Sequence, residues 1–169
     1  KLTLGNPATI AAGATGNVTL TAAAAGSLAG TTTLALTSQA LTGTGLTDLS
    51  LDAQSTAITG AAYDYANANV STANVAFGYI HVGAAAVTRN VSVANTAITS
   101  ATYQDNLTAT ATAVTGLSVN TLSEMAAGAS GNLVFSASSA AAGSLAGSVN
   151  FSLNSTNTVS GLDAKALAT

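Results

Sequence analysis

The chain lacks cysteine and tryptophan, has a single proline, and carries few aromatic and few charged residues. Without cysteine, the chain cannot form disulfides or thiolate metal sites, and it has no cysteine nucleophile. Charged residues are 5% of the 169, against about 25% in a typical soluble domain. Because so little charge keeps neighbouring molecules apart, this composition favours association of the chain with copies of itself.

The basic residues are also too few and too scattered to recognise phosphates. They are Lys1, Arg89 and Lys165, and the net charge is −3. Nucleic acids and anionic membranes require clustered Lys or Arg, so we expect neither as a partner. No apolar run approaches the roughly 20 residues of a membrane helix, so membrane insertion is not expected. The absence of cysteine is compatible with secretion from a bacterium.

Catalytic and cofactor chemistry also has little to build on. The single histidine, His81, has no Gly-x-Ser-x-Gly elbow to accompany it, and zinc needs more ligands than one histidine. Asp48 and Asp52 are close in sequence but lack the Asp-x-Asp-x-Asp-Gly pattern of a calcium loop. The glycines at 43 and 45 precede no lysine, which a phosphate loop requires. We therefore expect no enzyme activity, no cofactor and no metal.

The chain does contain a duplicated block. Residues 11–18 (AAGATGNV) return as residues 126–133 (AAGASGNL), 115 positions later. Residues 25–30 (AGSLAG) return as residues 142–147, 117 positions later. The second copy therefore carries a two-residue insertion, and one stretch with its flanks is used twice.

Apolar residues in both copies alternate with period two, which predicts strands with one buried face. Each replacement between the copies keeps the apolar residue on the same face, as a one-sided strand requires. Glycines that fall between these strands predict turns. The predicted core residues are Val18, Leu20, Leu34, Leu36, Phe77, Val91, Val93, Phe135, Phe151 and Leu153.

The region between the copies, about residues 61–122, has no earlier counterpart. Its alternation predicts strands at 62–67, 73–82, 87–95, 102–114 and 116–120. From Leu107 to Ala113, small or apolar residues share one parity and threonines the other, which predicts a strand with a thin inner face and a threonine outer face. Arg89 shares parity with Val91 and Val93, so we expect its side chain to snorkel from a sheet margin.

One segment of this region carries a family motif. Phe77, Gly78, Val82 and Gly83 fit a Phe-Gly-x-x-x-Val-Gly pattern, and Val91, Val93, Asn95 and Thr96 end the following strand. This combination resembles the opening of Hydin-like immunoglobulin domains and of related modules in bacterial choice-of-anchor surface proteins. The resemblance covers about two-thirds of the chain. It implies an antiparallel β-sandwich of about seven strands that is structural or adhesive, with no shared catalytic residues.

We therefore expect an all-β chain: an antiparallel immunoglobulin-like β-sandwich at 62–169, preceded by a half-repeat at 1–61. The half-repeat matches the later strands of a sandwich and lacks its opening strands, so it should expose an apolar face and unpaired strand edges. Packing against the second copy would cover that face. So would strands from another subunit, or preceding strands of a longer array.

These features predict a structural subunit of an extracellular or cell-surface bacterial fibre, sheath or layer, with copies of itself as partner. The residues expected to join subunits are Lys1, Leu2, Thr3, Leu4 and Ile10. The alternative is an adhesin or carbohydrate-binding module that stacks sugars on Tyr63, Tyr65 or Tyr103. Glycans are possible partners at Asn-x-Ser/Thr sites, which begin at Asn17, Asn69, Asn90, Asn106, Asn150 and Asn154.

Overall fold

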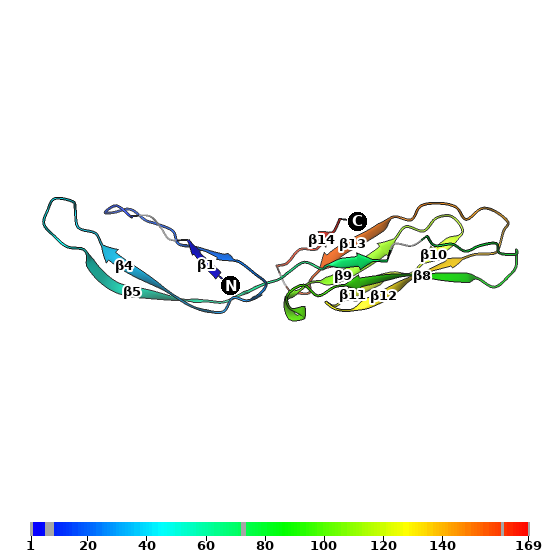
Figure 1. Ribbon diagram of the computed structural model, residues 1–169, viewed down its shortest axis with the longest axis horizontal. Coiled ribbons are helices and arrows are strands. Elements are labelled where there is room, and N and C mark those ends of the chain that lie inside the picture. Colours follow the sequence, from blue (N-terminus) through cyan, green and yellow to red (C-terminus); the bar gives the residue numbers. More distant parts are fainter. Residues whose placement is uncertain (1, 6–8, 72–73, 160, 169) are drawn as a thin grey trace. The chain divides into compact units, whose positions relative to one another are not determined.

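The computed structural model describes residues 2–5, 9–71, 74–159 and 161–168 (Figure 1). These residues are nearly all β or irregular, with one three-residue 3-10 helix, η1 (Ala101–Tyr103). Every described ladder of strands is antiparallel, and one isolated bridge, between Asp64 and Gln104, is parallel. The predicted all-β, antiparallel class is confirmed. The chain divides into two compact units, unit 1 (Lys1–Ala62) and unit 2 (Tyr63–Thr169).

Unit 2 consists of two four-stranded sheets, which Figure 1 shows as two layers. The first sheet has the order β10 (Leu117–Val119), β12 (Ser130–Ala137), β8 (Val87–Asn95), β7 (Ala68–Val70). The second has the order β11 (Leu122–Met125), β9 (Asn106–Ala111), β13 (Phe151–Thr156), β14 (Lys165–Ala166). The two central strands of each sheet, β12 with β8 and β9 with β13, carry most of the inward-facing apolar residues.

The core of unit 2 lies between these sheets. Leu133, Phe135 and Val93 of the first sheet are fully buried, as are Leu107 and Ala109 of the second. On β9 the inward residues alternate with Thr108 and Thr110, which are half-buried, so the threonine parity faces outward. Burial of these side chains is the main source of stability. Of the predicted core residues in unit 2, Phe77, Val91, Val93, Phe135 and Leu153 are buried and Phe151 is half-buried.

The strand predictions were correct at 87–95 and near 116–120, where β8 and β10 lie. β8 spans Val87–Asn95, as the alternation predicts. Of the strand predicted at 102–114, only Asn106–Ala111 is a strand. The strand predicted at 62–67 was wrong, because residues 63–67 form only an isolated bridge at Asp64.

The strand predicted at 73–82 was also wrong, because no strand lies among the described residues 74–86. Gly78 and Gly83 have φ of 69° and 79°, in the left-handed region that interrupts extended backbone. Phe77 reaches the core from this loop, and Val75 and Ile80 pack against it, whereas Tyr79 and Val82 are exposed.

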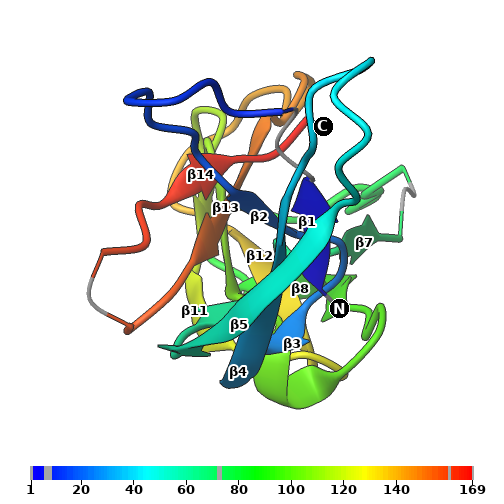
Figure 2. The same ribbon diagram turned by 90° about the vertical axis from the view of Figure 1, so that its left-hand side faces the viewer.

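Unit 1 consists of three two-stranded ladders. They pair β1 (Leu2–Gly5) with β2 (Thr19–Ala22), β3 (Gly26–Ser27) with β6 (Ala61–Ala62), and β4 (Gly30–Ser38) with β5 (Leu49–Ile58). Figure 2 shows β4 and β5 as a twisted two-stranded ribbon, the usual form of an isolated pair of strands. Among the described residues of unit 1, Gly26 alone is buried.

Candidate assembly surface

The first two strands of unit 1 repeat a ladder of unit 2 in the same register. In unit 1, Leu2 lies opposite Ala22 and Leu4 opposite Leu20. In unit 2, Leu117 lies opposite Ala137, and the next inward pair, Val119 and Phe135, follows. The residue numbers on both strands differ by 115, which is the spacing of the first sequence repeat. The β1–β2 ladder of unit 1 therefore corresponds to the β10–β12 ladder of unit 2.

The hairpin formed by β4 and β5 repeats a second ladder of unit 2. Thr37 and Ser38 lie opposite Ser50 and Leu49. Their counterparts 117 positions later, Asn154 and Ser155, lie opposite Ala166 and Lys165. The residue numbers of β5 and β14 differ by 116, so the loop between β13 and β14 is one residue shorter than the loop between β4 and β5. β4 and β5 therefore correspond to β13 and β14.

Two central strands of unit 2 correspond to edge strands in unit 1. In unit 2, β12 is paired on its second side with β8, and β13 with β9. In unit 1, β2 has only β1 as a neighbour and β4 has only β5, within the residues described there. A central strand pairs its backbone N–H and C=O groups on both sides, whereas an edge strand leaves one row free to pair with another chain. The described part of unit 1 thus contains counterparts of β10, β12, β13 and β14, and two of these have one strand neighbour fewer than in unit 2.

The missing neighbours leave apolar side chains exposed. Leu133 and Phe135 are 0% exposed in unit 2, and their counterparts Val18 and Leu20 are 36% and 37% exposed. Val18 and Leu20 were predicted as core residues; within unit 1 they are not, because no described strand pairs with the second edge of β2. Leu34 and Leu36 are half-buried and form the wall of a groove.

The space between the ladders of unit 1 is an open apolar groove. One part, of about 240 Å³, lies between β1, β2 and residues 27–32, and another, of about 900 Å³, lies along β4. Leu4 lines both parts, and none of the described residues that line them is charged. We call the two parts together the unit 1 groove. Its large apolar side chains are Leu2, Leu4, Ile10, Leu20, Leu28, Leu34, Leu36, Leu51 and Ile58.

Three of the five residues predicted to join subunits line this groove. Leu2 and Leu4 line it from β1 and Ile10 lines it from the segment before β2. Thr3 is exposed on β1 and donates its hydroxyl hydrogen to the Thr21 carbonyl (Oγ1–O 3.3 Å). Lys1 lies outside the described residues. β1 already pairs with β2 over four residue pairs. The other edge of β2 has no described partner, whereas the same edge of its counterpart β12 pairs with β8.

Unit 2 shows what holds a completed sandwich together besides its apolar core. Asn95 is fully buried at the end of β8 and donates through Nδ2 to the carbonyls of Asp105 and Met125, both at 2.9 Å. Its Oδ1 accepts from Gln104 Nε2 and from the Asn67 backbone N–H, both at 3.0 Å. Asn95 therefore uses all its side-chain hydrogen-bonding capacity and joins both sheets.

A second set of bonds extends this polar cluster to β13. Ser155 donates to Asp105 (Oγ–Oδ2 2.8 Å) and accepts from the Ala66 backbone N–H at 2.8 Å, and Asn157 donates to Asp105 Oδ1. Because a buried carboxylate is costly without partners, these two donors explain how Asp105 is accommodated. The sequence analysis recognised Asn95 only as part of a motif and missed Gln104, Asp105 and Ser155. Asp105 shares parity with the buried Leu107, and Ser155 with the buried Leu153, which was the available signal. Gln104 has the opposite parity and gave no such signal.

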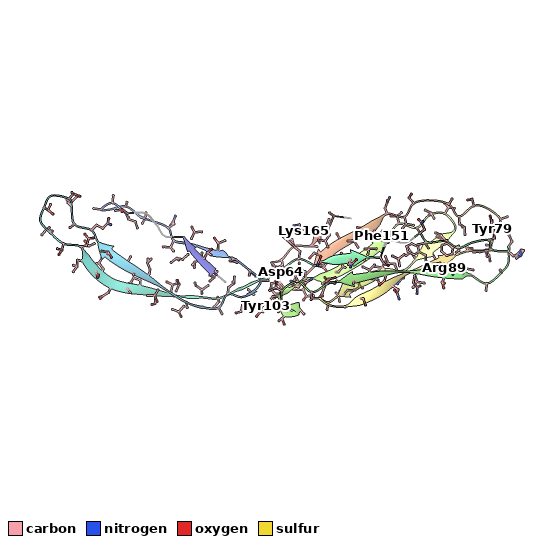
Figure 3. The ribbon with its side chains drawn as sticks, in the orientation of Figure 1. Asp64, Tyr79, Arg89, Tyr103, Phe151 and Lys165 are labelled. Carbon is pink, nitrogen blue, oxygen red and sulfur yellow. The ribbon has the colours of Figure 1, made fainter. Side chains whose placement is uncertain are left out.

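The tyrosines predicted as a sugar-stacking platform do not form one flat, open surface. Tyr63 and Tyr103 pack edge to face, with ring centroids 5.6 Å apart, and both are half-buried. Tyr65 is 50% exposed, but Lys165 Nζ lies 3.9 Å from its ring centroid, as a cation–π contact. Figure 3 shows Tyr103 and Lys165 toward the same end of unit 2 as Asp64.

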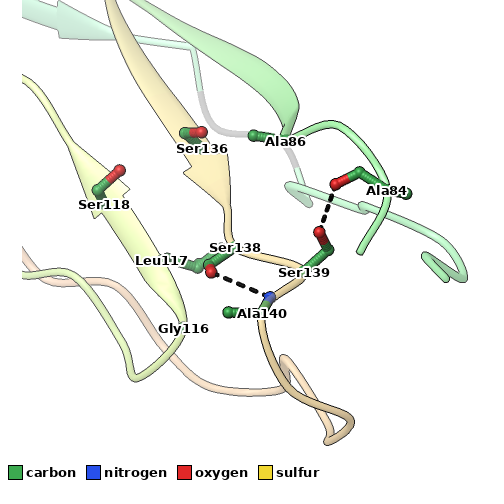
Figure 4. Close-up of a pocket in the computed structure, with 9 residues that line it drawn as sticks. All are labelled: Ala84, Ala86, Gly116, Leu117, Ser118, Ser136, Ser138, Ser139 and Ala140. Carbon is green, nitrogen blue, oxygen red and sulfur yellow. Dashed lines mark hydrogen bonds between the residues drawn. The ribbon is translucent and has the colours of Figure 1, made fainter. Parts of the chain in front are cut away.

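The other polar positions of unit 2 do not come together as a reactive site. His81 is exposed in a turn, and Arg89 is exposed and donates to the carbonyls of Ala76 and Thr88. The pocket in Figure 4, of about 540 Å³, is lined by serine, alanine, glycine and leucine. Ser139 and the Ala140 backbone N–H are held there by bonds to Ala84 O and Ser138 Oγ. The described lining of this pocket contains no acidic, basic or histidine side chain.

Comparisons of this chain with protein-family models, with curated proteins and with solved structures found no match. The resemblance to choice-of-anchor and Hydin-like modules therefore stays a prediction. Over the residues that the structure describes, no helix has the length and apolar character to cross a membrane. In the same residues, no three acidic or histidine side chains are grouped to hold a metal ion.

Proposed function

We propose that this chain is a structural subunit of an extracellular bacterial assembly, such as a fibre, sheath or surface layer. Subunits join when β-strands of a neighbour complete unit 1. The observation that carries this proposal is the unit 1 groove: two strands that are central in unit 2 have a free edge in unit 1, beside an uncovered apolar surface. Exposed strand edges pair with other chains by backbone hydrogen bonds.

The electrostatics of the chain support the same proposal. The described residues that line the groove carry no charge, and only nine of the 169 residues are charged. No strong like-charge repulsion therefore opposes joining, and the exposed leucines gain about 25 cal/mol for each Å² removed from water. An immunoglobulin-like topology for unit 2 belongs to this proposal, since modules of that kind serve as building blocks in surface structures.

Electron microscopy and sedimentation of the purified protein at neutral pH test the proposal. We expect filaments, sheets or large oligomers that form with rising concentration. Leu4→Asp places a charge in the groove and should abolish assembly, because an unpaired buried charge is strongly unfavourable. Leu41→Asp is the matched control, since Leu41 lies between β4 and β5, is highly exposed and does not line the groove. Monodisperse 16.1 kDa particles at all concentrations would overturn the proposal.

The alternative, an adhesin or carbohydrate-binding module, has weaker support. It needs aromatic rings whose faces are open to a sugar, whereas Tyr63 and Tyr103 pack on each other and Lys165 lies over Tyr65. A glycan-binding screen compares the two functions directly. Binding that is lost in Tyr65→Ala, with no assembly by the wild-type protein, would favour the adhesin.

A further inference from the structure

We propose that the occupant of the unit 1 groove is a strand segment of the same type as residues 63–111, supplied by a further repeat of this kind. The inference rests on the proposed function for the idea that the groove is a joining surface, and it names the partner. Unit 2 provides the template, because its β12 and β13 are copies of strands in unit 1 and their neighbours are known.

The apolar part of the occupant follows from those neighbours. Leu133 of β12 lies opposite Val91 of β8, and Leu153 of β13 lies opposite Ala109 of β9. The corresponding positions in unit 1 are Val18 and Leu36, both on the incompletely covered face. The occupant therefore needs one strand with valines at alternate positions and a second strand with small or branched apolar residues, joined as β8 and β9 are.

The polar part follows from the cluster around Asn95. In unit 2, Asn95 donates to the Met125 carbonyl and Asp105 accepts from Ser155. The counterparts of Met125 and Ser155 in unit 1 are Ile10 and Ser38, at the repeat spacings of 115 and 117. Ser38 is exposed, whereas Ser155 is fully buried. We therefore expect the occupant to carry an asparagine at the end of its first strand and an aspartate just before its second.

The number of strands decides where the occupant comes from. Each chain has two acceptor halves, unit 1 and the β10–β14 part of unit 2, and one segment of the 63–111 type. Exchange of that segment between copies completes unit 1 of one chain but opens unit 2 of another. Copies of this chain can therefore protect β2 in an assembly without completing every unit. A further repeat can complete every unit. Direct pairing of two unit 1 grooves, β2 against β2 and β4 against β4, is the competing arrangement.

A fusion protein tests this inference. A second copy of residues 63–115 is placed directly before Lys1, which restores the spacing seen in unit 2, where Gly116 follows Thr115. The control fusion carries Val91→Asp and Val93→Asp in the added copy only, because buried carboxylates there prevent packing. Amide hydrogen exchange is then measured at Thr19–Ala22 and Gly30–Ser38, with the oligomeric state measured by light scattering.

We expect the fusion to be monomeric, and its β2 and β4 amides to exchange at least about tenfold more slowly than in the control fusion. Equal exchange in the two fusions would overturn the inference. The inference would also be overturned, in favour of paired grooves, if the wild-type protein is a dimer whose β2 amides exchange slowly and the fusion shows the same oligomeric state and the same exchange. Assembly of the wild-type protein is a separate readout: slow exchange in the fusion without wild-type assembly would refute the proposed function alone.

Discussion

Leu20 and Phe135 occupy equivalent positions in two copies of the same strand, but Leu20 is 37% exposed and Phe135 is 0% exposed. The local sequences are alike, and the ladders on one side of each strand have the same register. The difference lies on the other side, where β12 pairs with β8 and β2 has no described neighbour. The exposure of Leu20 therefore measures how incomplete unit 1 is.

Truncating these two residues should have very different costs. Phe135→Ala should lower the free energy of unfolding of unit 2 by about 3–5 kcal/mol, because it leaves a cavity in a packed core. Leu20→Ala should cost less than about 1 kcal/mol in unassembled protein, since much of its side chain remains in water. Urea unfolding measures the first by tyrosine fluorescence, because all four tyrosines are in unit 2, and the second by circular dichroism. Equal costs would contradict this description of unit 1.

A pair of equivalent glycines gives a second test. A Cβ at Gly147 would lie 2.8 Å from Val114 Cγ1, whereas nothing lies within 4 Å of a Cβ at Gly30. Gly147→Ala should therefore destabilise unit 2 by about 1–3 kcal/mol through overpacking, while Gly30→Ala should be nearly neutral. In the fusion with an added residue 63–115 segment, Gly30→Ala should become destabilising. If Gly30→Ala stays neutral in the fusion, the valine at position 114 of the added segment does not pack against Gly30 as Val114 packs against Gly147 in unit 2.

The polar cluster should be essential for unit 2. Asn95→Ala removes four side-chain hydrogen bonds and leaves buried polar groups without partners, which costs about 1–3 kcal/mol for each such group. We expect a loss of more than about 2 kcal/mol in urea unfolding. Asn90→Ala, at an exposed position of the same strand, is the control and should change stability by less than about 0.5 kcal/mol. A tolerated Asn95→Ala would show that the cluster is dispensable.

Sodium chloride should not weaken assembly through the unit 1 groove, because the described residues that line it are uncharged. Salt screens exposed charges at separations beyond about 10 Å at 0.1 M, whereas sulfate strengthens the burial of apolar surface. Sedimentation in 0.05 M and 0.5 M sodium chloride should give the same assembled fraction, and sodium sulfate should raise it. Dissociation in sodium chloride would instead indicate joining through the few charged residues.

Much of the fold could be predicted from sequence because the strands have one buried face. The alternation around Val91 and Val93 predicted β8 correctly, and the repeat predicted that Leu20 and Phe135 share a strand position. The segment around Gly78 and Gly83 was predicted as a strand because it is apolar, but positive φ at both glycines interrupts it. Periodicity records which residues are apolar, not whether the backbone is extended.

The polar cluster and the groove were harder to predict, for different reasons. Asn95, Asp105 and Ser155 meet only when the sheet that contains β8 packs on the sheet in which β9 pairs with β13, so sequence spacing does not reveal them. The half-repeat stays a prediction, but it led us to expect an uncovered apolar face, and Val18 and Leu20 are exposed. It also led to Val18 and Leu20 being assigned to a core, and burial depends on neighbours that the strand's own sequence does not specify.

Hydrogen exchange of β2 during assembly tests the central claim most directly. The wild-type protein is labelled at low and at high concentration, and exchange is followed at Thr19–Ala22 with Ser130–Ala137 of β12 as the internal reference. We predict that exchange at β2 slows at least about tenfold as particles form, toward that of β12, because the free edge becomes hydrogen-bonded. Assembled particles in which β2 exchanges as fast as in the dilute protein would contradict the claim that unit 1 is the joining surface.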